Sequence, residues 1–110
     1  MSNEITIEKH FVVSTGHITE EDNDKLYDHC IDNNSYSYLC VYDHESGYVI
    51  HVPYDSFDDK EWNEFLQCMQ RDKFSNTFMQ LFDLAKQHDC CYITLDCDGT
   101  EYNFLPTYEW

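Results

Sequence analysis

The sequence predicts an α+β domain in which helices pack on a small mixed or antiparallel sheet. Its 110 residues are the usual size of one domain, so we expect residues 1–110 to fold as a single unit. Hydrophobic residues make up 42% of the chain and aromatic residues 16%, which is enough apolar side chain to build a core. Local patterns follow one another in the order β-α-β-β-α-α-β, and this order decides the fold class.

The first predicted strand and helix occupy the start of the chain. Residues 5–13 are rich in β-branched and aromatic side chains, which favour a strand. Thr19 then stands before three acidic residues, and this predicts a helix start, because a hydroxyl caps free amides and acids suit the positive end of the helix dipole. We expect this helix over about residues 20–32, with apolar side chains at helical spacing: Leu26, Tyr27, Cys30 and Ile31.

Three more strands are predicted further along. Residues 36–42 and 48–52 are rich in β-forming side chains and read as a hairpin, with residues 43–47 as its loop of three to five residues. Residues 92–95 form a compact apolar strand, followed by a turn over residues 96–99.

Two amphipathic helices lie between the hairpin and the last strand. Apolar residues repeat at i, i+3, i+4 and i+7 over about residues 58–71, and the rule recurs over residues 75–88. Each repeat predicts a helix that turns an aromatic stripe toward the core. The predicted core residues are Trp62, Phe65, Leu66, Met69, Phe74, Phe78, Leu81, Phe82 and Ala85.

The charge of the chain is extreme. Asp and Glu number 22 against six Lys and Arg, which gives a net charge of −16. Such a field repels phosphates and anionic membranes, so we expect neither nucleic acid nor membrane as a direct partner. Because no export signal precedes them, we expect a cytoplasmic location and free thiols at the six cysteines, Cys30, Cys40, Cys68, Cys90, Cys91 and Cys97.

Two groups of acidic residues are the candidate partner-binding site. Residues four apart on a helix climb ~6 Å, so the first group would place carboxylates at a spacing close to that of phosphates along a nucleic acid strand. Like charges at this spacing destabilise a helix by about 0.2–0.5 kcal/mol per pair, which suggests a use other than folding. For either group alone, the alternative is a solvated helix face. The groups are Glu21, Asp24, Asp28 and Asp32, then Asp55, Asp58, Asp59, Glu61 and Glu64.

An Asp-x-Asp-Gly-Thr string follows the last strand, at residues 96–100. It is similar to the first motif of the haloacid dehalogenase phosphohydrolases, in which two aspartates and a magnesium ion act on phosphate. A small metal-dependent phosphohydrolase built on Asp96 and Asp98 is therefore a remote alternative, since only ten residues follow Thr100. The six histidines lack the spacing of metal ligands. We expect no enzyme, no catalytic residue, no metal and no cofactor.

Two segments carry a resemblance: His10–Thr19 (HFVVSTGHIT), and Leu84–Gly99 (LAKQHDCCYITLDCDG) running into Leu105–Trp110 (LPTYEW). They resemble a family of small acidic bacterial proteins of unknown function, often carried on plasmids and other mobile elements. The resemblance implies no activity and assigns no site residue. It does imply a mobile-element setting, in which a role against restriction or CRISPR machinery is expected.

The leading functional hypothesis is a non-enzymatic acidic binding protein. Its acidic face would block the basic nucleic-acid-binding site of a partner, such as a nuclease or a CRISPR or restriction component, as the DNA mimics of phages do. The main alternative is an interaction module or a homodimer that docks through the aromatic tail, which comprises Tyr102, Phe104, Tyr108 and Trp110.

Overall fold

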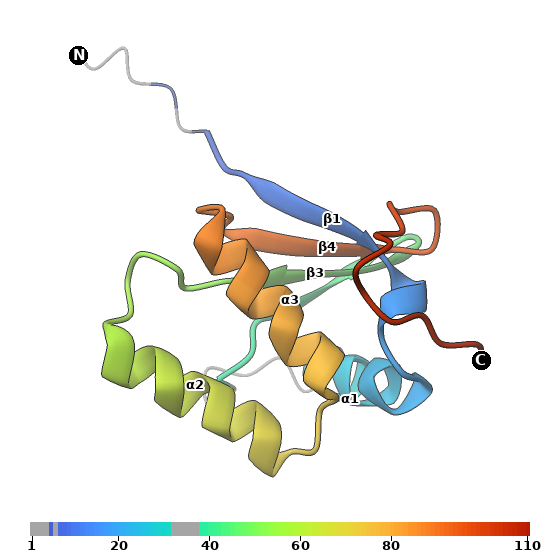
Figure 1. Cartoon of the computed structure of the whole chain (residues 1–110), viewed down its shortest axis with the longest axis horizontal. Helices are drawn as coiled ribbons and strands as arrows, with labels where there is room; N and C mark the ends of the chain where they lie inside the picture. Colours follow the sequence, from blue (N-terminus) through green and yellow to red (C-terminus); the bar gives the residue numbers. More distant parts are fainter. Residues whose placement is uncertain (1–4, 6, 32–37) are drawn as a thin grey trace.

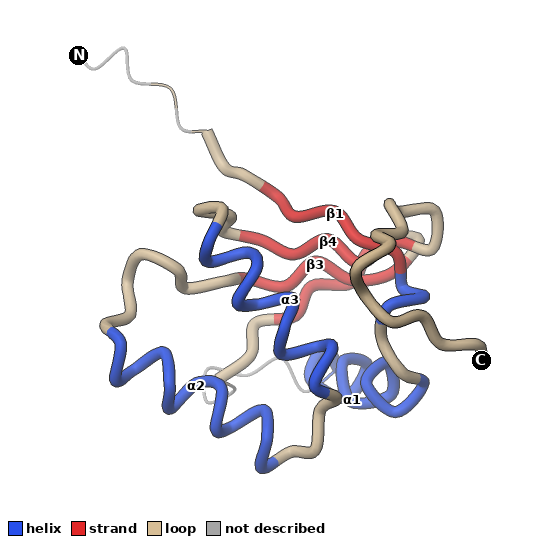
Figure 2. Tube along the Cα trace, viewed as in Figure 1, coloured by secondary structure: helices blue, strands red, loops and turns tan. Residues whose placement is uncertain are grey.

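The protein folds into two layers, a four-stranded sheet and three helices that cover one face of it (Figures 1 and 2). This computed structural model describes residue 5, residues 7–31 and residues 38–110. The helices are α1 (Glu20–Ile31), α2 (Asp59–Arg71) and α3 (Asn76–Gln87). The α+β class and the β-α-β-β-α-α-β order are confirmed.

The sheet is mixed and has the strand order β1-β4-β3-β2. Its strands are β1 (His10–Ser14), β2 (Val41–His44), β3 (Gly47–His51) and β4 (Tyr92–Asp96). The last strand inserts beside the first and runs parallel to it, while β3 pairs antiparallel with both β4 and β2. Strands β1 and β2 therefore form the two edges.

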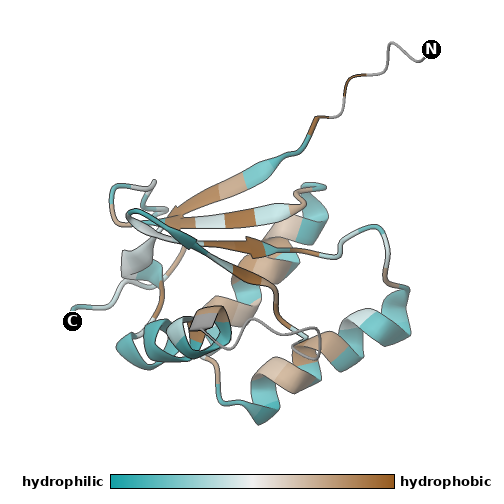
Figure 3. Ribbon diagram, turned by 180° about the vertical axis from the view of Figure 1, so that it is seen from behind, coloured by the Kyte–Doolittle hydropathy of each residue, from teal (hydrophilic) through white to brown (hydrophobic). Residues whose placement is uncertain are grey.

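Alternation along the strands separates a covered face from an open one. Val13, Ile50, Ile93 and Leu95 are buried beneath the helices. Their neighbours in sequence point the other way, and Val12 is among the exposed apolar residues. In the hydropathy colouring α2 and α3 contain hydrophobic segments, whereas α1 is mostly hydrophilic (Figure 3). The hydrophobic residues of α2 and α3 include Trp62, Phe65, Phe78 and Phe82, which are buried in the core.

Side chains cap both core helices as their sequences require. The Asp58 carboxylate accepts a hydrogen bond from the Glu61 amide at 2.8 Å, and the Asp58 amide donates one to the Glu61 carboxylate, which completes a capping box. Ser75 caps α3 by accepting from the Phe78 amide at 3.1 Å. Eight of the nine predicted core residues are buried, and the ninth, Leu66, packs against them.

Two predictions about β structure were wrong in detail. The first strand begins at His10, because the parallel strand β4 begins opposite it at Tyr92, so that Ile5 and Ile7 have no neighbouring strand among the described residues. The hairpin turn is two residues long, since His44 already pairs with Gly47. Gly47 itself lies against β4, where a Cβ would stand 1.9 Å from the Leu95 carbonyl oxygen.

The segment before β2 also differs from the prediction. The strand starts at Val41, and Tyr38 lies outside it; residues 36–37 fall outside the described part of the chain. The Tyr38 hydroxyl donates a hydrogen bond to the Asp72 carboxylate at 2.6 Å, just after the end of α2. Burial and this hydrogen bond raise the pKa of Tyr38 well above its ordinary value. Tyr27, expected on the apolar side of α1, is 57% exposed.

Candidate functional site: the acidic helical surface

The outer face of α1 presents carboxylates that the fold does not use. Glu21, Asp24 and Asp28 are all exposed. Within the described residues none of their three carboxylates takes part in a hydrogen bond or an ion pair. The fourth predicted member, Asp32, lies outside the described residues. We call Glu21, Asp24 and Asp28 the α1 acidic face.

One residue of the α1 acidic face, Asp24, also acts on the sheet. Burial is the main cause that raises the pKa of Tyr48 on β3, and electrostatic interactions with Cys30, Asp43 and, more weakly, Asp24 raise it further. Few cations oppose these negative charges: among the described residues, two ion pairs join Arg71 to Asp72 and Lys86 to Asp59. No ion pair among the described residues involves a carboxylate of the α1 acidic face, although Lys25 of the same helix lines a small pocket together with Asp28.

The second predicted group lies around the start of α2 and has a different character. All five of its residues are exposed. However, Asp58 and Glu61 form the capping box, and Asp59 lies 3.9 Å from the Lys86 ammonium group. These acids stabilise the helix start, where negative charge is favoured by the helix dipole. For this group the local structure supports a folding role, which leaves Asp55 and Glu64 as the members without one.

The two acidic groups do not form one surface. In both ribbon views α3 lies between α1 and α2, and the start of α2 is the end farthest from α1 (Figures 1 and 3). The sequence could not show this separation, because it depends on how the helices cross the sheet. A partner of ordinary size could meet the α1 acidic face without touching the start of α2.

One acidic residue that sequence reasoning missed is fully buried. Asp22, in the first turn of α1, accepts hydrogen bonds from the Thr19 amide at 3.0 Å, the Ser75 amide at 2.9 Å and the Ser75 hydroxyl at 2.5 Å. Its own amide donates to the Thr19 hydroxyl at 3.0 Å. The carboxylate thus joins the starts of α1 and α3, where two helix dipoles favour negative charge. The threonine three residues before it was the only signal in the sequence.

The aromatic tail lies against the domain's own surface (Figure 1). The Tyr108 amide donates to the Gly16 carbonyl at 2.8 Å, and the Trp110 indole N–H donates to the Ile18 carbonyl at 3.0 Å. Phe104, in contrast, is 63% exposed. Three of the tail's four aromatic residues, Tyr102 included, are engaged within the chain, and Phe104 is the one most available to another molecule.

A buried histidine holds this tail in place. His17 accepts a hydrogen bond at Nε2 from the Tyr102 amide at 2.8 Å, and its Nδ1 lies 2.7 Å from the Pro106 carbonyl oxygen. Since Nε2 is the acceptor, Nδ1 carries the proton and donates to Pro106. One ring therefore fastens two points of the tail to the turn after β1.

The Asp96–Cys97–Asp98 turn brings three potential metal ligands within 4.8 Å of one another. The Asp98 amide donates to the Asp96 carboxylate at 2.8 Å, the geometry of a turn stabilised by an aspartate side chain. Asp98 and Cys97 are exposed. The hydrogen bond accounts for Asp96 as a turn residue, and all six cysteines of the chain are free thiols.

A family model matches residues 10–110, from the first residue of β1 to the end of the tail. Its description is the C-terminal domain of a family of unknown function, DUF5983. The chain belongs to the DUF5983 family. No curated protein and no solved structure matches the chain. No helix in the described part of this DUF5983 domain is long and apolar enough to cross a membrane.

Proposed function

We propose that this DUF5983 protein is a non-enzymatic binding protein whose α1 acidic face occupies a basic, nucleic-acid-binding site on a partner protein. The observation that carries the proposal is that Glu21, Asp24 and Asp28 are exposed and engaged in no hydrogen bond or ion pair within the described residues. Their charges are therefore free to meet Lys and Arg side chains of another molecule.

The charge of the whole chain supports the same class of partner. At −16, the protein attracts basic surfaces from a distance and speeds the encounter with them. A site that binds nucleic acid is such a surface, because its affinity rests on Lys and Arg contacts with phosphates. We propose that the protein acts in the bacterial cytoplasm and is encoded on a plasmid, phage or other mobile element. We propose a nuclease or a CRISPR or restriction component as its partner.

The proposal now rests on fewer residues than the sequence suggested. The α1 acidic face, with Asp32 beyond the described residues, keeps the role of partner-binding surface. Asp58, Asp59 and Glu61 have local roles at the start of α2, so their contribution to a partner is proposed as secondary. Asp55 and Glu64 would add negative charge around that second group without setting the orientation of the complex.

The test is an affinity capture from bacterial lysate at low and high salt. The wild type is compared with the triple variant Glu21→Gln/Asp24→Asn/Asp28→Asn. A matched control removes three exposed acids from turns far apart in the chain, Glu45→Gln/Asp89→Asn/Asp98→Asn. We expect a nucleic-acid-binding protein to be captured by the wild type and the control at low salt, and to be lost in the α1 variant and at high salt.

A second measurement separates mimicry from simple charge attraction. The captured protein is mixed with its DNA or RNA, and the wild-type chain is added in increasing amounts. Competitive release of the nucleic acid by the wild type and the turn variant, and none by the α1 variant, would support the proposal. Capture of the same proteins by all three forms would refute it, because the α1 acidic face would then be a solvated helix surface.

A further inference from the structure

Half of the β1 edge of the sheet is left open by the residues that the structure describes. Along β1, backbone groups alternate in direction: the Lys9 carbonyl accepts from the Cys91 amide at 2.9 Å, so odd-numbered residues face β4. Even-numbered residues face outward. There the tail covers the second half of the strand, where the Tyr102 hydroxyl donates to the Val12 carbonyl at 3.0 Å. No described segment of the chain covers the outward side of Glu8 and His10.

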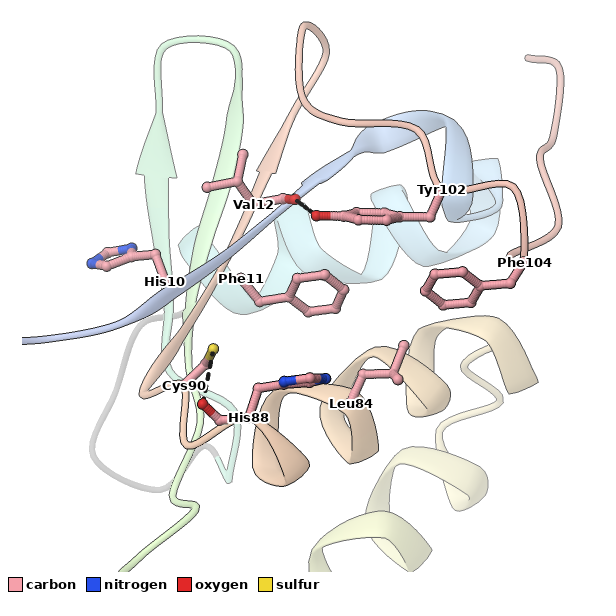
Figure 4. Close-up of a pocket in the computed structure, with 8 residues that line it drawn as sticks. All are labelled: His10, Phe11, Val12, Leu84, His88, Cys90, Tyr102 and Phe104. Carbon is pink, nitrogen blue, oxygen red and sulfur yellow. Dashed lines mark hydrogen bonds between the residues drawn. The ribbon is translucent and has the colours of Figure 1, made fainter.

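A pocket of about 470 Å³ opens beside this free edge. Phe11 of β1, Leu84 of α3 and Phe104 of the tail point toward one common space, while the His10 side chain points away from it (Figure 4). His88 and Cys90 close the end of the pocket near the last turn of α3. The walls are mostly apolar, and Phe104 is largely exposed. An aliphatic side chain would therefore gain by entering.

Two apolar side chains just before β1 are largely exposed. Ile5 and Ile7, in the segment that leads into β1, are 83% and 81% exposed, more than any other large hydrophobic residue of the described chain. In an extended segment they would lie on the same side as Phe11, because side chains alternate with a period of two. The exposed isoleucine side chains and the apolar pocket are thus complementary surfaces.

We propose that two copies of the chain pair antiparallel through their β1 edges about a twofold axis, so that Ile5 and Ile7 of each copy enter the pocket of the other. In the register centred on Lys9, Glu8 lies opposite the partner's His10, and Ile7 lies opposite the partner's Phe11. Glu8 and His10 both present outward backbone groups, so they form a hydrogen-bonded pair of an antiparallel ladder. An acid also faces an imidazole in each such pair.

Symmetry makes the contact complete, because each chain supplies both the groove and its occupant. The pairing would also close an edge that would otherwise remain a template for aggregation. The opposing effect is repulsion between two chains of charge −16. Salt screens this repulsion, so higher salt strengthens the dimer, whereas it weakens the partner complex proposed above.

The test is sedimentation velocity of the purified chain over a concentration series at low and high salt. We expect a reversible dimer that becomes tighter as salt increases. Ile5→Ser/Ile7→Ser should weaken it more than tenfold, because four buried isoleucine side chains are lost from each dimer. The matched control is Tyr42→Ser, which removes a side chain that is 50% exposed on the other edge strand and leaves the dimer unchanged.

A variant that removes a backbone amide tests the proposed ladder independently of the isoleucine side chains. Glu8→Pro removes an outward amide from the proposed ladder and should also abolish the dimer, while circular dichroism shows an intact fold. A wild type that stays monomeric at every concentration and salt would overturn the proposal. So would an Ile5→Ser/Ile7→Ser variant that dimerises like the wild type. Neither result touches the α1 acidic face, which lies on a separate element.

Discussion

Replacing Asp22 should destabilise the protein more than replacing any exposed acid. The carboxylate is fully buried and accepts three hydrogen bonds from Thr19 and Ser75. Asp22→Asn keeps the shape but places an amide group, itself a donor, against donors that need an acceptor. A hydrogen bond to a charged group contributes about 1.5–3 kcal/mol. Because one oxygen remains, we expect a loss of about 2–4 kcal/mol for Asp22→Asn, and about 3–5 kcal/mol for Asp22→Ala.

Urea denaturation followed by circular dichroism measures this loss. The urea concentration at the midpoint of unfolding should fall, while the slope of the unfolding free energy against urea concentration stays constant, since the surface exposed on unfolding is unchanged. Against a typical domain stability of about 5–15 kcal/mol, the alanine variant would be only marginally folded. The control is Asp24→Asn, two residues away and exposed, which should change stability by less than about 0.5 kcal/mol.

A double-mutant cycle with Ser75→Ala tests the cause. If Asp22 acts by joining the starts of α1 and α3, the two changes should show a coupling energy of about 1–3 kcal/mol. Additive effects would mean that the carboxylate serves α1 alone. An Asp22→Asn variant as stable as the wild type would refute the reasoning altogether.

Two further predictions concern the tail and the thiols. His17→Ala should cost about 2–4 kcal/mol and release the tail, because a buried ring with two hydrogen bonds is lost; the fluorescence of Trp110 should then report greater exposure to water. Burial raises the pKa of Cys90, so less thiolate forms at a given pH. Iodoacetamide at pH 8 should therefore modify Cys90 much more slowly than exposed Cys97, and mass spectrometry of the digested protein would show the order.

The parts of the fold that the sequence predicts are those with strong local periodicity. The stripes around Trp62 and Phe78 and the caps at Asp58 and Ser75 define α2 and α3 almost to the residue. The sequence predicts a first strand that is too long, because β-branched residues such as Ile7 occur both in paired strands and in extended segments without a neighbouring strand. Whether a strand forms depends on its pairing partner.

From the sequence, the candidate site could be predicted only as an excess of acidic residues. Exposure of Asp24 and Asp28 followed from the helical pattern, but the roles of other acids depended on contacts far away in sequence. Asp22 binds Ser75, 53 residues later, and Asp59 lies near Lys86 on the next helix. A count of carboxylates cannot separate those that build the fold from those left for a partner.

The stability of the protein should increase with salt concentration. Unpaired carboxylates at neighbouring helix positions repel one another, and a net charge of −16 opposes the compact state. Two unit charges 10 Å apart in water interact by about 0.4 kcal/mol, so screening of several pairs on the α1 acidic face should increase stability by about 1 kcal/mol.

The assay is urea denaturation in 10 mM and in 500 mM sodium chloride. The Debye length is ~30 Å at the lower concentration and below ~10 Å at the higher one. Glu21→Gln/Asp24→Asn/Asp28→Asn should be more stable than the wild type in low salt and should gain less from added salt. The turn variant, Glu45→Gln/Asp89→Asn/Asp98→Asn, loses the same formal charge but no helix-face neighbours, so its low-salt gain should be smaller. Equal gains in the two variants would show that total charge, rather than the α1 acidic face, sets the cost. A larger gain for the α1 variant would mean that the face is kept at the expense of stability, as a surface selected for binding would be.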